Sequence, residues 1–376
     1  MAVTDNRLRC AVLGASGYTG AELVRILARH PGAEIAVLTA DRHAGQPLER
    51  VFPHLGGLGL PDLIAIEEVE WPGLDVDIVF CALPHGTTQE VVAGLLHKTG
   101  HDLVDELIHE GRGDLAAGVP GAVKVIDLSA DFRFEDVATY KAVYGHDHKA
   151  PALQQEAVYG LTEIFRADVA GARLVANPGC YPTASLLPLI PLVELGLIVE
   201  DDIIIDAKSG VSGAGRAAKE ASLYAEVGEG IHAYGIANHR HAPEIEQELG
   251  RAAGHPVTVN FTPHLMPMNR GILATIYVRL DRAANAAALR SALLERYEQE
   301  RFVRVLTEGQ APATRHVRAS NDCVIGVFDD RVSGRAILVS AIDNLVKGGA
   351  GQAVQNMNVM TGQGEAAGLD HVAVFP

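Results

Sequence analysis

A single cysteine follows a rigid turn in the segment Val175–Ala184. Asn177-Pro178-Gly179 is a turn sequence, Cys180 follows it directly, and an apolar stretch with helical character comes next. A thiol at a helix N-terminus has a lowered pKa and more of the reactive thiolate. Pro188 and Pro191 lie within the stretch, which predicts a short or kinked helix. The segment indicates a nucleophilic cysteine, the alternative being a small buried apolar residue.

A nucleophilic cysteine needs a base, which is usually a histidine close in space. Among the 16 histidines, His239 and His241 form the best candidate pair, because they flank Arg240 just before a predicted helix start at Ala242-Pro243-Glu244. On extended backbone the two side chains share a face, as in half of a metal site. No Cys/His/Asp set with zinc or iron spacing accompanies them, so the pattern favours acid–base chemistry and no metal is predicted.

Three glycines near the start of the chain are spaced as in a phosphate-binding turn. Gly14, Gly17 and Gly20 follow the apolar run Leu8–Leu13 and precede the helical segment 21–29. In such a turn the first glycine permits the tight bend, the second lets backbone N–H groups approach a pyrophosphate, and the third allows close helix–strand packing. The pattern predicts a dinucleotide site at a helix N-terminus.

The next strand-like run ends in residues that bear on the choice of dinucleotide. Thr39 and Arg42 suit the 2′-phosphate of NADP, whereas Asp41 suits the free ribose hydroxyl of NAD. Spacing alone leaves this choice open.

The order of elements predicts two domains. Short apolar runs alternate with helical segments up to about residue 177, which predicts a parallel sheet covered by helices. Beyond it, runs such as 203–207, 257–261, 271–280 and 323–328 are separated by long connections and by helix candidates at 243–251 and 286–300, which predicts a mixed α+β domain. A polar piece, Lys98–Gly118, interrupts the first domain as a surface insertion.

Composition excludes several classes of partner. The chain has 376 residues with 31 Lys and Arg against 47 Asp and Glu, a formal charge of −16 without a basic cluster, so no nucleic acid partner is expected. The apolar stretches are too short for a membrane span, and the start lacks a secretory core. Cys10, Cys81 and Cys323 lie scattered in apolar runs and read as buried thiols. We therefore expect a cytoplasmic protein.

The chain resembles the N-acetyl-γ-glutamyl-phosphate reductases, arginine-biosynthesis relatives of aspartate-semialdehyde dehydrogenase. The resemblance covers nearly the whole chain and is carried by eight segments: residues 14–23, 82–86, 127–133, 159–161, 178–183, 209–215, 239–241 and 343–348.

This resemblance implies a fold and a reaction. The fold is a Rossmann-type α/β dinucleotide-binding domain, residues 1–176 and 340–376, plus an α+β catalytic and dimerisation domain with a mixed sheet, residues 177–339. The reaction is the NADPH-dependent reduction of a small acyl phosphate through a thioester, in a homo-dimer or homo-tetramer.

The resemblance also implies roles for particular residues. Cys180 is the nucleophile and His239 its acid–base partner, with His241 in reserve. Arg133, Arg240 and His241 bind substrate, Arg133 as the clamp on its phosphate. The residues implied around NADP are Gly14, Ser16, Gly17, Tyr18, Thr19, Gly20, Thr39, Arg42, Pro84, Ser209, Gly210, Ser212, Gly213 and Asn344.

Three other functions stay open. A reductase of a carrier-linked aminoadipyl phosphate in lysine synthesis needs a basic entrance for an acidic carrier, which the charge of −16 disfavours. Aspartate-semialdehyde dehydrogenase is disfavoured by the His-Arg-His element. A catalytically silent NADP sensor has no need of Cys180 or His239. Thiol labelling distinguishes the sensor from the enzyme, because the enzyme should have one fast-reacting cysteine, Cys180, and the sensor should have none.

Overall fold

The computed structural model describes residues 7–71, 75–98, 123–281 and 284–376. Two compact units divide the chain: residues 1–178 with 350–370, and residues 179–349 with 371–376. The expected return to the first domain at residue 340 thus falls at residue 350. The reason is that strand β14 (Arg335–Ile342) and the turn after it belong to the second unit's sheet.

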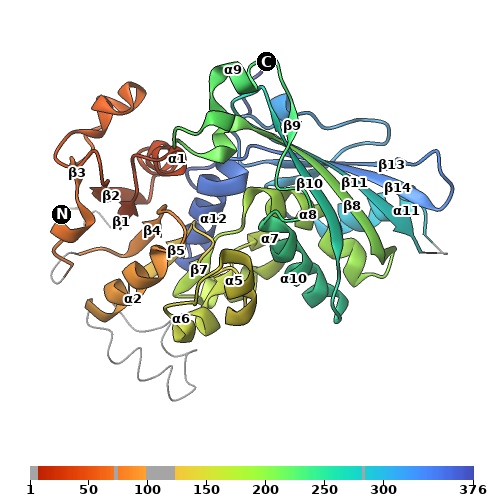
Figure 1. Cartoon of the computed structure of the whole chain (residues 1–376), viewed down its shortest axis with the longest axis horizontal. Helices are drawn as coiled ribbons and strands as arrows, with labels where there is room; N and C mark the ends of the chain where they lie inside the picture. The colour runs from red at the N-terminus through yellow and green to blue at the C-terminus, as the bar shows by residue number, and fades with distance from the viewer. Residues whose placement is uncertain (1–6, 72–74, 99–122, 282–283) are drawn as a thin grey trace, which may run out of the picture. The chain divides into compact units, whose positions relative to one another are not determined.

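The first unit is built on a parallel sheet (Figure 1). Among the described residues its seven strands have the order β3-β2-β1-β4-β5-β7-β6, and each pairing is parallel. Strands buried on both faces are apolar throughout, as Ile78–Cys81 shows. The bounds are β1 Leu8–Leu13, β2 Ala33–Thr39, β3 Leu63–Ile64, β4 Ile78–Cys81, β5 Lys124–Asp127, β6 Val158–Tyr159 and β7 Leu174–Ala176.

The first unit also holds helices and short 3-10 turns. They are α1 Tyr18–Leu27, α2 Thr88–Lys98, α5 Val137–Tyr144, α6 Pro151–Glu156, α7 Thr162–Gly171 and α12 Gly351–Met360, with turns at Leu48–Arg50, Pro53–Leu55 and Ile66–Glu68. The predicted insertion Lys98–Gly118 lies outside the described residues from 99 on. The parallel α/β architecture expected for this half of the chain is confirmed.

Helix α12 belongs to the first unit although it comes near the end of the sequence, and it carries buried side-chain amides. The amide of Gln352 donates to Gly160 O at 3.1 Å and to Thr162 Oγ1 at 2.6 Å, and Asn356 Nδ2 donates to Gly160 O at 2.9 Å. A buried polar group is costly unless it is paired, so these bonds fix where α12 docks against α7.

The second unit holds a mixed sheet with the order β12-β13-β14-β11-β8-β10-β9 in the part of the chain described. Pairs β8–β10 and β12–β13 are parallel, and the other pairs are antiparallel. The remaining bounds are β8 Ile198–Gly210, β9 His232–Ala233, β10 Val259–Met266, β11 Ile272–Leu280, β12 Val303–Val305 and β13 Cys323–Asp329. The expected α+β domain with a mixed sheet is confirmed.

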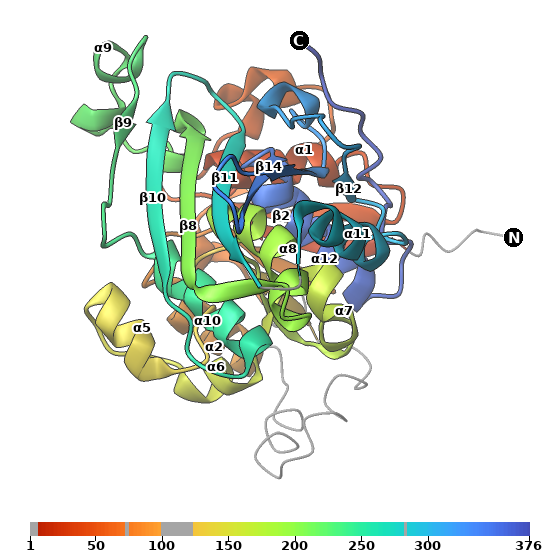
Figure 2. The same cartoon turned by 90° about the vertical axis from the view of Figure 1, so that its right-hand side faces the viewer.

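Helices pack against this second sheet (Figure 2). They are α8 Cys180–Glu194, α10 His241–Ala253 and α11 Ala286–Arg296, and the unit also holds α9 Tyr224–Val227. Along β8, Ile203, Ile205 and Ala207 are buried, while Ile204 and Asp206 between them are half-buried. This alternation gives the sheet one face for the helices.

Helix α8 does not shorten at its prolines. It runs over 15 residues, so the expectation of a short helix is wrong. Pro191 has no N–H to give to Leu187 O, four residues earlier, and the hydroxyl of buried Tyr297 donates to that carbonyl instead. A side chain from another helix region therefore replaces the backbone hydrogen bond to Leu187 O that the proline removes.

Candidate active site

Cys180 is the first residue of α8, and Gly179 is the N-cap. Its side chain is half-buried, whereas Cys10, Cys81 and Cys323 are buried. Burial raises the pKa of Cys10 to about 12 and raises the pKa of Cys81 well above its ordinary value. These two thiols stay protonated, so Cys180 is the accessible cysteine at a helix N-terminus.

The turn from β7 into α8 fixes where the thiol sits. Thr183 returns to the N-cap with both its amide, 2.9 Å from Gly179 O, and its hydroxyl, 3.0 Å from the same oxygen. Gly348 lies close by: a Cβ there would stand 2.7 Å from the Cβ of Cys180. A glycine at 348 is what lets the backbone pass beside the nucleophile.

A buried carboxylate holds the residue before the cysteine. Glu244, in the first turn of α10 and 1% exposed, accepts the Gly179 amide at 2.8 Å through Oε1. The bond joins α10 to the start of α8, two helices that pack together. Sequence reasoning missed Glu244. The one available signal is its position in the helix turn that follows His241.

His239 and His241 lie in an aromatic cluster with the residue next to Cys180. The ring of Tyr181 is 5.7 Å from that of His239 and 5.8 Å from that of His241, and the two imidazoles are 4.9 Å apart. Tyr234 and Phe261 complete the cluster, with ring centroids 5.4 and 5.3 Å from His239. The fold thus gathers the predicted pair and the nucleophile's neighbour in one place.

The imidazole of His239 is neutral at ordinary pH. Burial removes water from the ring and the cation of Arg240 opposes a second charge, so the pKa of His239 falls to about 4. Its Nδ1 accepts the amide N–H of His241 at 3.2 Å.

Two phenols extend the cluster. The hydroxyls of Tyr181 and Tyr234 are 3.0 Å apart. Burial raises both pKa values, that of Tyr234 to about 12 and that of Tyr181 further still, so both stay protonated and able to donate. The charge of a Cys180 thiolate raises both pKa values as well, which places the sulfur within electrostatic range of the two phenols.

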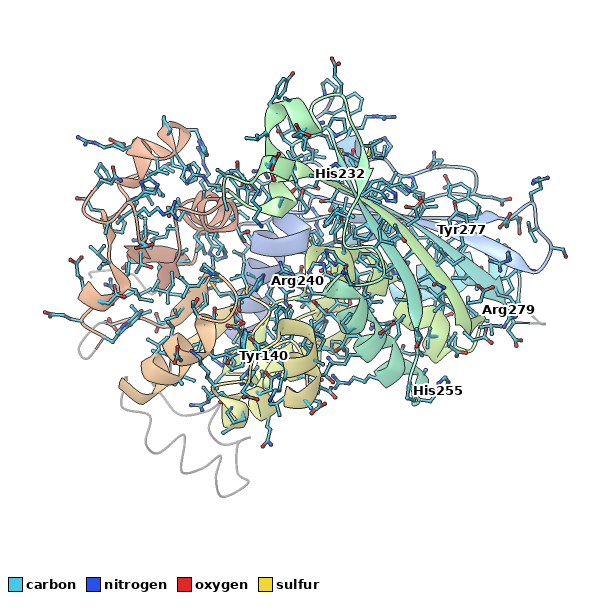
Figure 3. The ribbon with its side chains drawn as sticks, in the orientation of Figure 1. Tyr140, His232, Arg240, His255, Tyr277 and Arg279 are labelled. Atoms are coloured by element: carbon cyan, nitrogen blue, oxygen red, sulfur yellow. The ribbon has the colours of Figure 1, made fainter. Side chains whose placement is uncertain are left out.

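The two predicted arginines differ in exposure. Arg133, 6% exposed, donates from Nε to Asn177 O at 2.8 Å and from Nη2 to Leu128 O at 3.2 Å, which ties down the backbone entering the cysteine turn. Arg240 is exposed and directly precedes α10, and His255 follows the opposite end of that helix (Figure 3). A substrate clamp at either arginine stays a prediction.

The three glycines of the turn in the first unit differ in how closely the backbone packs around them. A Cβ at Gly14, where φ is +85°, would lie 2.4 Å from Ala82 O, and one at Gly20 would lie 2.3 Å from Gly14 O. At Gly17, the N-cap of α1, the nearest such atom is Gly14 O at 3.5 Å. The turn therefore packs tightly at its ends and opens in the middle, which fits a pyrophosphate against the helix N-terminus.

Neighbouring side chains shape this turn. Thr39 is buried and its Oγ1 accepts the Gly14 amide at 3.2 Å, while Asp41 and Arg42 are exposed. Ser16, Tyr18 and Thr19 lie on the turn and the first residues of α1. Thr39 therefore supports the turn, and Arg42 is the exposed cation at the end of β2.

The loop after β4 carries Pro84 and depends on a buried acid that sequence reasoning missed. Asp131, fully buried, accepts the Gly86 amide at 2.8 and 3.0 Å and the Thr88 amide at 3.0 Å, and so caps α2 from a distance. Thr87 Oγ1 donates to Pro84 O at 2.7 Å. The carboxylate fixes this loop at the carboxyl edge of the sheet, where ligands of such folds bind.

The predicted cofactor residues of the second unit also come together. Asn344 donates through Nδ2 to Ser212 Oγ at 2.9 Å and accepts the Gly271 amide at 2.7 Å. A Cβ at Gly213 would lie 3.0 Å from Ser209 Oγ, and one at Gly210 would lie 2.7 Å from Asn269 O. Asn344 therefore links the strand end at 209–213 to the turn before β11.

Comparisons with known proteins agree with the fold of the two units. Residues 9–106 match the semialdehyde dehydrogenase NAD binding domain, and residues 180–344 match the semialdehyde dehydrogenase dimerisation domain. The aspartate semialdehyde dehydrogenase II of Vibrio cholerae complexed with ASA has a similar fold (TM-score 0.65, 17% identity, 94% of this chain and 98% of that one). The aspartate semialdehyde dehydrogenase of Candida albicans with NADP compares at TM-score 0.63 with 17% identity over 94% and 98%. The fold and both domain matches define a semialdehyde dehydrogenase, an oxidoreductase class.

Curated relatives are more specific. An N-acetyl-gamma-glutamyl-phosphate reductase of Rhodospirillum rubrum is 59% identical over 99% of this chain and 100% of its own length. That of Afipia carboxidovorans is 55% identical over 97% and 98%. A probable chloroplastic one of Arabidopsis thaliana is 53% identical over 99% and 86%. The chain belongs to the N-acetyl-gamma-glutamyl-phosphate reductase family, and the resemblance read from the sequence is confirmed. Within the described residues, no helix is long and apolar enough to cross a membrane.

The bond between Glu244 and Gly179 generates a prediction. Glu244→Ala removes the acceptor that orients the cysteine turn, and a misplacement of about 1 Å costs roughly 10²-fold in rate. We expect kcat to fall by about that factor, while Glu244→Gln, whose amide oxygen still accepts, stays within about tenfold of the unaltered protein. Steady-state kinetics together with the alkylation rate of Cys180 measure both variants.

Glu246→Ala is the matched control, because Glu246 Oε1 also accepts a backbone amide, that of Val259 at 3.0 Å, away from the cysteine turn. Equal losses in Glu244→Ala and Glu246→Ala would contradict the positioning role.

Proposed function

We propose that this protein reduces N-acetyl-γ-glutamyl phosphate to N-acetylglutamate semialdehyde, with release of phosphate, as a step of arginine biosynthesis in the cytoplasm. The observation that carries the proposal is Cys180 at the start of α8, with its neighbour Tyr181 packed against His239. The names of the relatives that match over nearly the full chain support this substrate.

In this mechanism Cys180 is the nucleophile. Its thiolate adds to the acyl carbon of the acyl phosphate, phosphate leaves, and a thioester forms, which divides one difficult reduction into two easier steps. His239 is the acid–base partner and faces the acyl oxygen while that oxygen carries negative charge. The exposed Arg240 binds the anionic substrate together with His241. Arg133 fixes the turn before Cys180 through its hydrogen bond to Asn177 O.

The dinucleotide in this proposal is NADP. The turn Gly14–Gly20 holds its pyrophosphate, and the cofactor roles that the family resemblance implies for Pro84, Ser209–Gly213 and Asn344 stay predictions. When bound in reduced form, it supplies the hydride that takes the thioester to the aldehyde. Arg42, exposed at the end of β2, is the guanidinium for the 2′-phosphate, and a fungal structural neighbour described with NADP supports the choice.

We also propose a homo-dimer, or a homo-tetramer built from it. The match of residues 180–344 to a dimerisation domain supports the self-association.

One assay tests the function. The purified protein is given N-acetylglutamate semialdehyde, phosphate and NADP⁺, beside parallel reactions with NAD⁺ and with aspartate semialdehyde. The proposal expects phosphate-dependent reduction of NADP⁺ with the acetylated substrate, at least about tenfold faster than the other pairs. No turnover with any pair would favour the silent NADP sensor, and preference for aspartate semialdehyde would overturn the substrate.

The cysteine assignment generates a second prediction. Cys180→Ser replaces a nucleophilic thiolate by a weakly nucleophilic hydroxyl, and we expect at least about 10³-fold loss of rate, roughly 4 kcal/mol of barrier. Iodoacetamide labelling of the unaltered protein should modify Cys180 first, with protection by substrate. A folded Cys180→Ser protein with near-normal turnover would show that another residue is the nucleophile.

The assignment of NADP as the cofactor generates a third prediction. Arg42→Ala removes one charge-assisted hydrogen bond, so the KM for NADP⁺ should rise about 10- to 100-fold while the KM for NAD⁺ changes little. Arg50→Ala, another exposed arginine nearby in the sequence, is the control. If the KM for NADP⁺ in Arg42→Ala stays unchanged, Arg42 does not contact the 2′-phosphate.

A further inference from the structure

A short π-helical turn, Val346–Ala350, lies between β14 and α12 in the sequence. The whole stretch from residue 341 to residue 350 is buried. The amide of Gly348 donates to Asp343 O at 2.9 Å, a bond that spans five residues as in a π-helix. Such turns are rare and are frequent at functional sites, which makes the groups that stabilise this one worth tracing.

The side chain of Asp343 fixes the start of this turn. The residue is fully buried, and its Oδ1 accepts the amides of Leu345 at 2.9 Å and Val346 at 3.3 Å. Its Oδ2 accepts the amide of Ala319 at 2.7 Å and lies 3.6 Å from Nη1 of Arg270. A buried carboxylate is costly unless its oxygens are bonded. Asp343 therefore joins the turn to two other segments of the second unit, the loop before β13 and the turn before β11.

One of these bonds is made by an unfavourable backbone. Ala319 has φ +61°, in the left-handed region that residues with a Cβ rarely adopt. In this conformation its amide donates to Asp343 Oδ2. Strain of this kind persists only where the surrounding structure imposes it, and it is commonest at sites of function.

A second buried charge fixes the middle of the turn. Lys347 is fully buried, and its Nζ lies 5.8 Å from the centre of the Phe302 ring. Burial raises the pKa of Asp322, and the charge of Lys347 is one of those that oppose this rise, so the ammonium lies within electrostatic range of that carboxylate. The residue next to Gly348 is therefore held by its own side chain.

The turn places Gly348 directly against the residue of the nucleophile. A Cβ at position 348 would stand 2.7 Å from Cβ and 3.2 Å from Cα of Cys180, and 3.1 Å from Cδ1 of Ile342. The backbone at Gly348 therefore limits the staggered positions that are open to the sulfur of Cys180. Movement of the turn would remove this limit.

We propose that Asp343 is a positioning residue for the reaction: it holds the π-helical turn so that Gly348 packs on Cys180, and this contact keeps the thiolate in the rotamer from which it attacks the acyl carbon. The inference rests on the proposed function, because it takes Cys180 as the nucleophile. Asp343 acts through the backbone of the turn, and a misplacement of about 1 Å at a reacting atom costs roughly 10²-fold in rate.

Two variants test the two ends of this connection. Asp343→Asn keeps the volume of the side chain but can no longer accept hydrogen bonds at both positions, and we expect kcat to fall about 10- to 100-fold. Gly348→Ala adds a methyl group against Cys180, and we expect a fall of about 100-fold. In both, the KM for N-acetylglutamate semialdehyde should stay within about threefold, because the substrate contacts are unchanged. A folded Gly348→Ala protein with unaltered kcat would overturn the proposal, whatever Asp343→Asn does.

Each variant has a matched control. Asp330 Oδ1 also accepts the amide two residues further on, that of Val332 at 3.0 Å, in the turn between β13 and β14, so Asp330→Asn should keep kcat within about twofold. Gly171 is exposed at the end of α7, and a Cβ there meets open space, so Gly171→Ala should do the same. Losses in the controls equal to those in the test variants would contradict a specific role of the turn.

A double-mutant cycle separates positioning from general stability. If Asp343 holds Gly348 against Cys180, the weakened turn of Asp343→Asn can move away from an added methyl group. Gly348→Ala should then cost at least about tenfold less in the Asp343→Asn background than in the unaltered protein. Equal costs in both backgrounds, in proteins with native circular dichroism, would show that Asp343 stabilises the fold without positioning the nucleophile.

The same cycle is measured without substrate through the alkylation of Cys180 by iodoacetamide. We expect Gly348→Ala to slow this reaction about tenfold, and Asp343→Asn to relieve most of that effect in the double variant. If the unaltered protein does not reduce NADP⁺ with N-acetylglutamate semialdehyde and phosphate, the proposed function fails, and the alkylation rates still decide whether Asp343 and Gly348 act together on the thiol. The same rate in all four proteins would overturn the inference.

Discussion

The amide of Gly179 is the point on which the site depends. It lies one residue before Cys180, and a carboxylate from another helix, Glu244, accepts its hydrogen bond while almost wholly buried. Burying a carboxylate costs free energy unless its oxygens accept hydrogen bonds. Movement of Glu244 away from the Gly179 amide would therefore destabilise the protein. The bond fixes both the start of α8 and the position of the nucleophile relative to α10, the helix that His239 and His241 precede.

Near this bond, aromatic side chains surround His239 and keep its environment apolar. Tyr181 continues the chain from the cysteine and packs on His239, so one residue connects nucleophile and imidazole. Low local polarity strengthens each hydrogen bond that a developing oxyanion meets, while it disfavours a charged ring.

Chemical type and spacing predicted much of this site. The turn before Cys180, the glycines at 14, 17 and 20 and the pair His239 and His241 each carry a local signature that needs no tertiary information. The parallel and mixed sheets followed from the change in element pattern near residue 177.

What the sequence could not reveal depends on long-range packing. Glu244 and Asp131 look like surface acids in the sequence, and only the fold shows each one buried against amides of distant residues. Pro191 looks like a helix breaker until the Tyr297 hydroxyl reaches Leu187 O.

The covalent step is tested most directly by trapping it. The protein is mixed with N-acetyl-γ-glutamyl phosphate without nicotinamide nucleotide, quenched in acid, digested and examined by mass spectrometry, with Cys180→Ala treated in parallel. We expect an N-acetylglutamyl group on the peptide that contains Cys180, removed by hydroxylamine and absent from the variant. An acyl group on a different residue, or phosphate release with no acylated peptide, would contradict it.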